Sequence, residues 1–265
     1  MEDPHAMSSE QLVQWLYSYI DEDSRLTGSR AASVEFHTTV KLLQRYLPAG
    51  SRVLDVGAGT GIYSFALAAQ GHRVDALELA DANVEVFRSK QPEASGILLQ
   101  QGNALDLSRY ESGSFDAVLC MGPLYHLPQR EDALRCLAEA RRVLKEGGLL
   151  FAAFIQSDMV ILTELCRDSS FLLQGAYNKE TFAVENMPFV FHTLAQSRAL
   201  LREADFSILS EVAADGVSEL LAEHINRMDE ETFSQYLRYH FYCCEQPHML
   251  GRSNHLLFVC RKERA

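Results

Sequence analysis

The stretch VLDVGAGTGIYS, residues 53–64, constrains the fold of this chain more than any other feature. Its first four residues have the composition of a short buried strand, and Gly57, Gly59 and Gly61 follow at alternate positions. The next residues, IYSFALAAQ, have the apolar spacing of a helix packed on a sheet. A strand, a glycine turn and a helix N-terminus in succession form a place where backbone can approach a ligand closely.

From residue 51 onward the sequence alternates between strand-like and helix-like segments. The expected strands are residues 52–56, 73–79, 97–101, 115–121, 149–155, 206–212 and 255–261. The expected helices between the first five strands are residues 61–70, 81–90 and 131–144, the last ending at Gly147-Gly148. This alternation predicts an α/β fold, a Rossmann-like, seven-stranded, mostly parallel sheet with helices on both faces.

The flanking segments have a different character. Apolar spacing predicts helices over residues 8–20 and 31–47, so residues 1–50 are expected to form an N-terminal helical cap on a domain of residues 51–265. Largely helical insertions are expected after the fifth and sixth strands, at about residues 156–192 and 217–252. We expect these insertions to form a substrate lid, because long connections tend to carry function.

Composition narrows the class of partner. The chain has 24 basic and 36 acidic residues, a net charge of −12, and this balance argues against nucleic acid as a partner. Its apolar runs are far shorter than the roughly 20 residues of a membrane helix, and the N-terminus lacks the pattern of a signal peptide. The six cysteines show no CxxC spacing, which indicates reduced thiols. We therefore expect a cytoplasmic protein without a membrane partner.

The glycine turn departs from the two common nucleotide-binding patterns. The third glycine of the NAD fingerprint is replaced by Ile62, and no GKS or GKT follows as in a P-loop. Asp55, two residues before Gly57, suits a ligand with amino groups or positive charge better than a pyrophosphate. Glu78 ends the second predicted strand, about 20 residues from the turn, where a carboxylate can accept both hydroxyls of a ribose.

Four motifs in order make the chain resemble the class I S-adenosylmethionine-dependent methyltransferases. They are VLDVGAGTG, ALELAD, QGNALDL, and FDAVLCMGPLYHL with the later EARRVLKEGGLLFAAF. The resemblance covers residues 51–155 in detail and the later segments more loosely. The relatives it suggests are bacterial small-molecule methyltransferases that carry a GPLYHL signature.

The resemblance implies S-adenosyl-L-methionine as cofactor and S-adenosyl-L-homocysteine as product. The implied cofactor-binding residues are Gly57, Gly59 and Gly61 at the methionine part, Asp55 near its amino group, Glu78 at the ribose, Asn103 and Ala104 at the adenine, Leu79 on the adenine face, and Met121 near the sulfonium. The family often has an aspartate at the position of Asn103, and an amide still hydrogen-bonds the adenine amino group.

Two residues after the fourth predicted strand are candidate catalytic groups. Methyl transfer is an in-line displacement that needs alignment, and it needs a base only if the nucleophile keeps a proton. His126 could act as that base or orient the substrate, although a histidine that hydrogen-bonds backbone and holds the loop is the more common arrangement. Tyr125 is expected to shape the pocket more than to move a proton.

Further candidates lie outside the four motifs. An N-terminal arginine suits the cofactor carboxylate, because a guanidinium binds carboxylates in bidentate fashion. Of Arg25 and Arg30 we favour Arg30, near the start of the second predicted helix. Tyr19, Phe189 and His192 are the expected substrate-binding residues. The histidines and acids show no ligand-like spacing, so no metal is expected.

The sequence therefore predicts a methyltransferase that moves a methyl group to an N, O or C nucleophile of a small molecule. Two alternatives stay open, a non-catalytic S-adenosylmethionine-binding regulatory protein and a protein or peptide methyltransferase. An NAD-dependent oxidoreductase is disfavoured by Ile62. The chain is expected to act as a monomer or homodimer.

Overall fold

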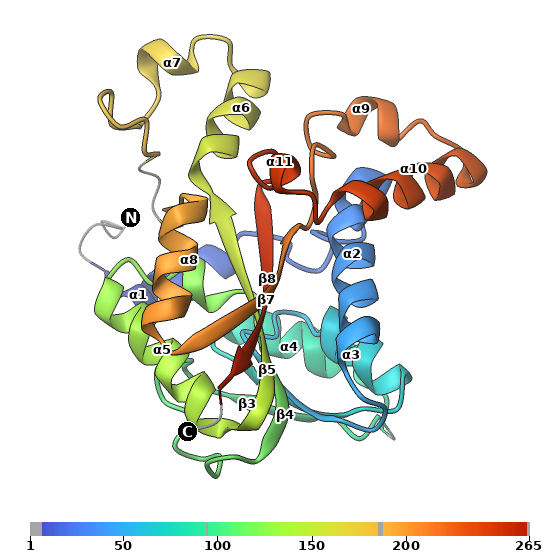
Figure 1. Ribbon diagram of the computed structural model, residues 1–265, viewed down its shortest axis with the longest axis vertical. Coiled ribbons are helices and arrows are strands. Elements are labelled where there is room, and N and C mark those ends of the chain that lie inside the picture. Colours follow the sequence, from blue (N-terminus) through green and yellow to red (C-terminus); the bar gives the residue numbers. More distant parts are fainter. Residues whose placement is uncertain (1–6, 94, 185–187, 264–265) are drawn as a thin grey trace.

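An eight-stranded sheet lies at the centre of the computed structural model, which describes residues 7–93, 95–184 and 188–263 (Figure 1). The strand order is β3-β2-β1-β4-β5-β8-β7, and β6 pairs with β5 off this path. β8 runs antiparallel to β5 and β7, whereas the other pairs are parallel. The strands are β1 (Arg52–Val56), β2 (Arg73–Glu78), β3 (Leu98–Gln101), β4 (Phe115–Cys120), β5 (Leu144–Gln156), β6 (Phe191–His192), β7 (Phe206–Ala213) and β8 (His255–Lys262).

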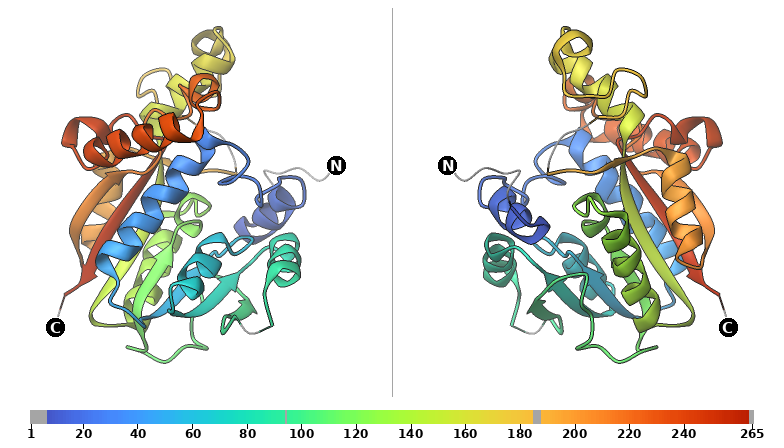
Figure 2. Two further views of the ribbon diagram at one scale, coloured as in Figure 1. Left: turned by 90° about the vertical axis from the view of Figure 1, so that its right-hand side faces the viewer. Right: turned by 90° about the vertical axis from the view of Figure 1, so that its left-hand side faces the viewer.

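Helices cover both faces of the sheet (Figures 1 and 2). One face carries α2 (Arg30–Tyr46), α3 (Ile62–Ala69) and α4 (Asp81–Lys90), and the other carries α5 (Arg130–Val143) and α8 (Leu194–Glu203). Strand β5 supplies both cores, because Leu150 and Phe154 enter one apolar cluster while Leu149 and Phe151 enter the other. This double burial explains why the strand reads as a continuous apolar run.

The predicted Rossmann-like, mostly parallel sheet is confirmed, with two corrections. The described chain has one strand more than the predicted seven, because the two residues of β6 add to β5. The helix predicted over residues 131–144 is present as α5, but Gly147-Gly148 do not end it, because α5 ends at Val143 and β5 begins at the next residue rather than at the predicted Leu149. The glycines lie instead in a bulge, since Leu144 pairs with Phe115 but Leu149 already pairs with Ala117.

The remaining helices lie outside the sheet layers. They are α1 (Ser9–Tyr17), the 3-10 turn η2 (Pro123–Tyr125), α6 (Ser157–Arg167), α7 (Phe171–Gln174), α9 (Ala222–Ile225), α10 (Glu230–Cys243) and α11 (Pro247–Leu250). The pair α6 and α7 projects from one end of the molecule (Figure 2). Val34 of α2 packs with Ile225 and Phe233, which holds α9 and α10 against the start of that helix. Within the described ranges, no helix has the length and apolar character to cross a bilayer.

Candidate binding cavity

A cavity of about 490 Å³ lies at the carboxyl ends of β1, β2 and β4. Its volume falls within the roughly 300–1,000 Å³ of ordinary small-molecule sites. Its wall comes from the glycine turn after β1, the end of β2, the loops after β3 and β4, and residues 8–26. We call residues 8–26, which comprise α1 and the start of its link to α2, the roof segment. The position is the usual ligand site of an open, largely parallel sheet.

The glycine turn presents bare backbone to this cavity at one residue. All three glycines have positive φ, +74° at Gly57, +56° at Gly59 and +93° at Gly61. A Cβ on Gly57 would lie 2.7 Å from Pro123, and one on Gly61 would lie 2.6 Å from Phe87, so both positions are filled by packing. A Cβ on Gly59 would meet nothing nearer than Glu22 Cγ, at 3.6 Å. Gly59 and Gly57 line the cavity, whereas Gly61 only caps α3.

Glu78, the last residue of β2, is fixed by two backbone N–H groups, one from the glycine turn and one from the link between β2 and α4. Its Oε2 accepts a hydrogen bond from the Gly59 N–H at 2.8 Å, and its Oε1 accepts one from the Ala80 N–H at 2.8 Å. Burial raises the pKa of this carboxyl, and the two backbone donors and the Asn83 amide oppose that rise. The carboxylate keeps lone pairs for further donors, because each oxygen can accept more than one hydrogen bond.

Asp55 of β1 lies at the base of the cavity and is almost fully buried. Its Oδ2 accepts a hydrogen bond from Ser64 Oγ at 2.7 Å. Burial raises its pKa to about 7, a rise that the Ser64 hydrogen bond opposes. A cation or an ammonium group placed beside it would therefore favour the ionised carboxylate.

Leu79, Asn103 and Ala104 lie together at another part of the wall, after β2 and β3. The Asn103 Oδ1 accepts from the Leu105 N–H at 2.9 Å, which fixes the amide. Its Nδ2 donates to Glu10 of α1 at 3.3 Å. The roof segment thus reaches across the cavity to this loop.

Tyr125 and His126 form the wall after β4, together with Met121. Tyr125 Oη donates to the Met121 carbonyl at 2.6 Å, so this phenol is already engaged. Nε2 of His126 lies 3.0 Å from Tyr17 Oη, and its Nδ1 lies 3.4 Å from the Pro188 carbonyl. Burial lowers the pKa of His126 to about 4, so the ring is neutral at physiological pH.

The roof segment is fastened to the body of the protein. The Gln14 side chain donates to the Leu79 carbonyl at 2.8 Å and accepts from the Asp81 N–H at 2.9 Å. These two bonds join α1 to the link between β2 and α4. Any ligand in the cavity therefore has α1 on one side and the glycine turn on the other.

Two residues of the N-terminal region that sequence reasoning favoured lie away from the cavity. Arg30 begins α2, with its guanidinium carbon 6.0 Å from the centre of the Phe233 ring. The Tyr19 side chain is 78% exposed. Their places at the cavity are taken by Arg25 and Tyr17. Tyr17 lies one helical turn after Val13 on the face of α1 that lines the cavity, and this four-residue spacing could have identified it from the sequence. No local pattern identifies Arg25.

Phe189 and His192 also lie outside the cavity lining. The Phe189 ring packs on His126 at a centroid distance of 5.1 Å, so it backs the cavity wall. His192 lies edge-on to Phe154 at 5.3 Å. Of the ten cofactor candidates, eight therefore line one cavity together with Tyr125 and His126, whereas Gly61 and Arg30 lie outside its lining.

Comparison with known proteins gives a family match for part of the chain. Residues 54–152 match the family described as "Methyltransferase domain". A ubiquinone biosynthesis O-methyltransferase of Xanthomonas axonopodis pv. citri is 42% identical over 109 residues, which are 40% of this chain and 44% of that protein. The chain thus spans less than half the length of the curated relatives it matches.

Solved structures share the whole fold at low sequence identity. An S-adenosylmethionine-dependent methyltransferase of Thermotoga maritima, described as a possible histamine N-methyltransferase, has a TM-score of 0.59 and 16% identity over 97% of this chain and 100% of its own. The (4+2)-cyclase SpnF has a TM-score of 0.61 and 20% identity over 98% of both chains. At such identities the likeness concerns the fold alone.

Proposed function

We propose that this chain is a class I S-adenosylmethionine-dependent methyltransferase that moves a methyl group to an N, O or C nucleophile of a small molecule. The observation that carries the proposal is the pairing of Glu78 with the Gly59 N–H at the edge of the cavity. It sets a ribose-type acceptor beside a turn that leaves backbone bare. The match of residues 54–152 to methyltransferase domains and the shared fold support the same reading.

The residues around the cavity fit this cofactor. Gly59 leaves open the space that a Cβ would fill, as backbone contact with the methionine part requires. Glu78 retains acceptor capacity for two ribose hydroxyls. Leu79 offers an apolar surface for the adenine ring, and Asn103 an amide for its polar edge. Arg25 supplies the positive charge for the carboxylate, in place of Arg30.

The protein's own part in the reaction is to orient and to exclude water. When bound, S-adenosylmethionine supplies a methyl group made electrophilic by the sulfonium. The roof segment covers one side of the cavity and so limits water there. The neutral His126 accepts a hydrogen bond from Tyr17, which leaves the phenol oxygen free to accept a proton-bearing nucleophile's hydrogen bond and align it.

The size and position of the cavity support a small acceptor. Five of the six residues of GPLYHL, 122–127, line the wall after β4, which the roof segment contacts through Tyr17 and His126. That segment is the signature by which the chain resembles bacterial small-molecule methyltransferases. The long connections around α6, α7 and α10 are proposed to contribute the outer part of the acceptor site, as a lid.

Calorimetry with S-adenosylmethionine and S-adenosylhomocysteine tests the cofactor. The wild-type protein should bind both, and Glu78→Gln should weaken both about 10- to 100-fold, because each lost charged hydrogen bond contributes about 1.5–3 kcal/mol. The exposed Glu85 of α4 gives a matched control, and Glu85→Gln should bind normally. Absence of binding to wild type at millimolar ligand would overturn the proposal.

Turnover is tested separately with a metabolite extract and a methyl-labelled cofactor, read by mass spectrometry. A labelled small product that disappears with Glu78→Gln supports the enzyme. Cofactor binding without any labelled product would favour the regulatory alternative, and label on proteins or peptides alone would favour a protein methyltransferase.

A further inference from the structure

Arg25 is the one arginine or lysine among the described residues that line the cavity. Its Nε donates to Glu22 at 2.9 Å, and its Nη1 donates to Glu35 at 2.9 Å. Both carboxylates oppose the desolvation of the guanidinium, and they raise its pKa well above the ordinary value. Among the described residues its Nη2 donates no hydrogen bond to a protein group, so one edge of the fork is available to a ligand.

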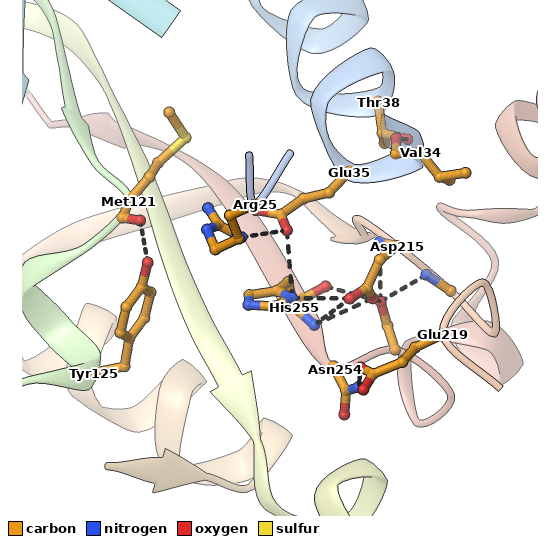
Figure 3. A network of polar contacts seen from close by, with 12 residues as sticks. Arg25, Val34, Glu35, Thr38, Met121, Tyr125, Asp215, Glu219, Asn254 and His255 are labelled. Carbon is orange, nitrogen blue, oxygen red and sulfur yellow. Dashed lines mark hydrogen bonds and ion pairs between the residues drawn. The ribbon is translucent and has the colours of Figure 1, made fainter. Parts of the chain in front are cut away.

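Glu35 of α2, which binds Arg25, also contacts a second charged side chain on its side away from the cavity, His255 (Figure 3). Its Oε2 lies 3.4 Å from Nδ1 of His255, at the start of β8. The same nitrogen lies 2.8 Å from Oδ2 of Asp215, which follows β7. Asp215 also accepts hydrogen bonds from the His255 N–H and from Ser253 Oγ. Four charged side chains from separate segments therefore form one continuous row that begins at the cavity.

Charge alternates along this row as plus, minus, plus, minus. Burial favours the neutral form of His255, but Glu35 and Asp215 outweigh it and raise its pKa to about 9. Burial acts to raise the pKa of Asp215, but the contacts with His255 and Ser253 outweigh it and lower that pKa. With a neutral ring, Glu35 would keep only the guanidinium as a charged partner, and a buried carboxylate with too few partners reorients or takes a proton.

The ligand atoms of Glu35, Asp215 and His255 lie within 4.8 Å of one another, so this cluster could hold a metal ion in place of the proton on His255. Two contacts favour the protonated ring over a metal ion. The 2.8 Å contact of Nδ1 with Oδ2 is a hydrogen-bond distance. The guanidinium of Arg25 already fills the cavity side of Glu35.

We propose that His255 is a positioning residue: through Glu35 it fixes Arg25 in the orientation that binds the carboxylate of the cofactor. The inference rests on the proposed function. It assigns a part in recognising the amino-acid end of the cofactor to β8, which contributes no residue to the cavity lining. Asp215 serves as the anchor of the imidazolium, and Glu35 transmits its position to the guanidinium.

The test compares two ligands, S-adenosylhomocysteine and 5′-methylthioadenosine, which has the same nucleoside without the amino-acid end. His255→Gln should weaken S-adenosylhomocysteine roughly 10-fold, the effect of one charged hydrogen bond, and should leave 5′-methylthioadenosine within about twofold. Arg25→Gln should show the same selective loss, at least as large. His72→Gln, outside the row and the cavity, is the matched control and should bind both ligands normally.

The outcomes separate this inference from the proposed function. If the wild-type protein binds neither ligand, the proposed function itself is contradicted. A wild type that binds both, with His255→Gln unchanged or weakened equally for both ligands, overturns the positioning role. If His255→Gln does not fold, Glu35→Gln is judged by the same criterion. Stoichiometric zinc that survives dialysis in wild type and is lost in His255→Gln would also overturn it.

Discussion

Tyr17 Oη lies 3.0 Å from Nε2 of His126 and thereby joins the roof segment to the loop after β4. The other ring nitrogen faces the Pro188 carbonyl, which accepts a hydrogen bond only from a protonated Nδ1. The two contacts together assign a neutral ring with the proton on Nδ1, so that Nε2 accepts from the phenol. The same histidine can therefore hold the loop through Nδ1 and orient a substrate through Nε2 and Tyr17.

The neutral state of His126 predicts a loss of stability in mild acid. Its pKa is about 4 in the folded protein, against about 6.5 when unfolded, so between these values the unfolded chain binds more protons. The free energy of unfolding should therefore fall as the pH drops from 6.5 to 4, by about 3 kcal/mol for this residue. Denaturant unfolding at pH 7 and 4.5 should show a smaller difference for His126→Gln. His224→Gln, at an exposed site, should keep the wild-type difference; an equal difference in both variants contradicts the assignment.

Gly59→Ala should leave the protein folded but weaken its binding of S-adenosylhomocysteine. Ala at a positive φ costs about 1 kcal/mol, and Gly113→Ala carries the same strain, since its φ is +66° with nothing within 4 Å. Both variants should therefore lose similar stability in denaturant titrations. In calorimetry, Gly59→Ala should bind S-adenosylhomocysteine about 10-fold or more weakly, because its Cβ enters the cavity. Gly113→Ala should bind it normally, and equal affinities in the two variants would count against the site.

Gln14 should control how quickly a ligand leaves the cavity. Gln14→Ala removes the two hydrogen bonds that fasten α1 to the link between β2 and α4. We expect about 1–2 kcal/mol less stabilisation of the closed roof segment and a faster release of S-adenosylhomocysteine, about 10-fold. Trp15, the one tryptophan of the chain, lies on α1 and reports the motion by stopped-flow fluorescence. Gln70→Ala, at the exposed end of α3, should release the ligand at the wild-type rate.

The six cysteines should differ sharply in reactivity. Cys166 of α6 is exposed and the other five are buried. Burial raises the pKa of Cys244 and Cys260 to about 12, so their reactive thiolate form is scarce. Iodoacetamide labelling read by mass spectrometry should modify Cys166 first in the native protein and all six after unfolding. Cys166→Ser should abolish the fast phase. Rapid labelling of Cys120, which contacts Cys136 at 3.7 Å, would show that the core opens more readily than its packing implies.

The sheet was predictable because its signals are local. β1 and β2 are each followed directly by an α-helix, whose apolar residues recur at a different spacing from those of a strand, and the double-sided burial of β5 is visible as an apolar run. The two-residue β6 carries no such signal. Gly147-Gly148 misled because a glycine pair ends a helix and opens a strand bulge equally well.

Some residues of the cavity could likewise be predicted from the sequence, and others could not. Glu78 and Gly59 could be paired from sequence because both stand at the ends of neighbouring parallel strands. The choice of Arg30 over Arg25 was wrong, because Arg25 lies in a polar link without periodicity, where no local pattern indicates which side chain reaches the cavity. What holds Arg25 at the cavity is Glu35 and, more than 200 residues later, His255. Such a contact depends on the finished topology.

Strand β8 lies between β5 and β7, although it begins 99 positions after β5 ends at Gln156. During synthesis, therefore, the edge of β5 that β8 will cover stays unpaired and apolar until β8 has been made. An unpaired edge can pair with the β5 of another molecule, and the long loop between β5 and β8 closes slowly. We expect refolding yield to fall steeply with protein concentration, and a peptide with the sequence of β8 to rescue it when supplied in excess.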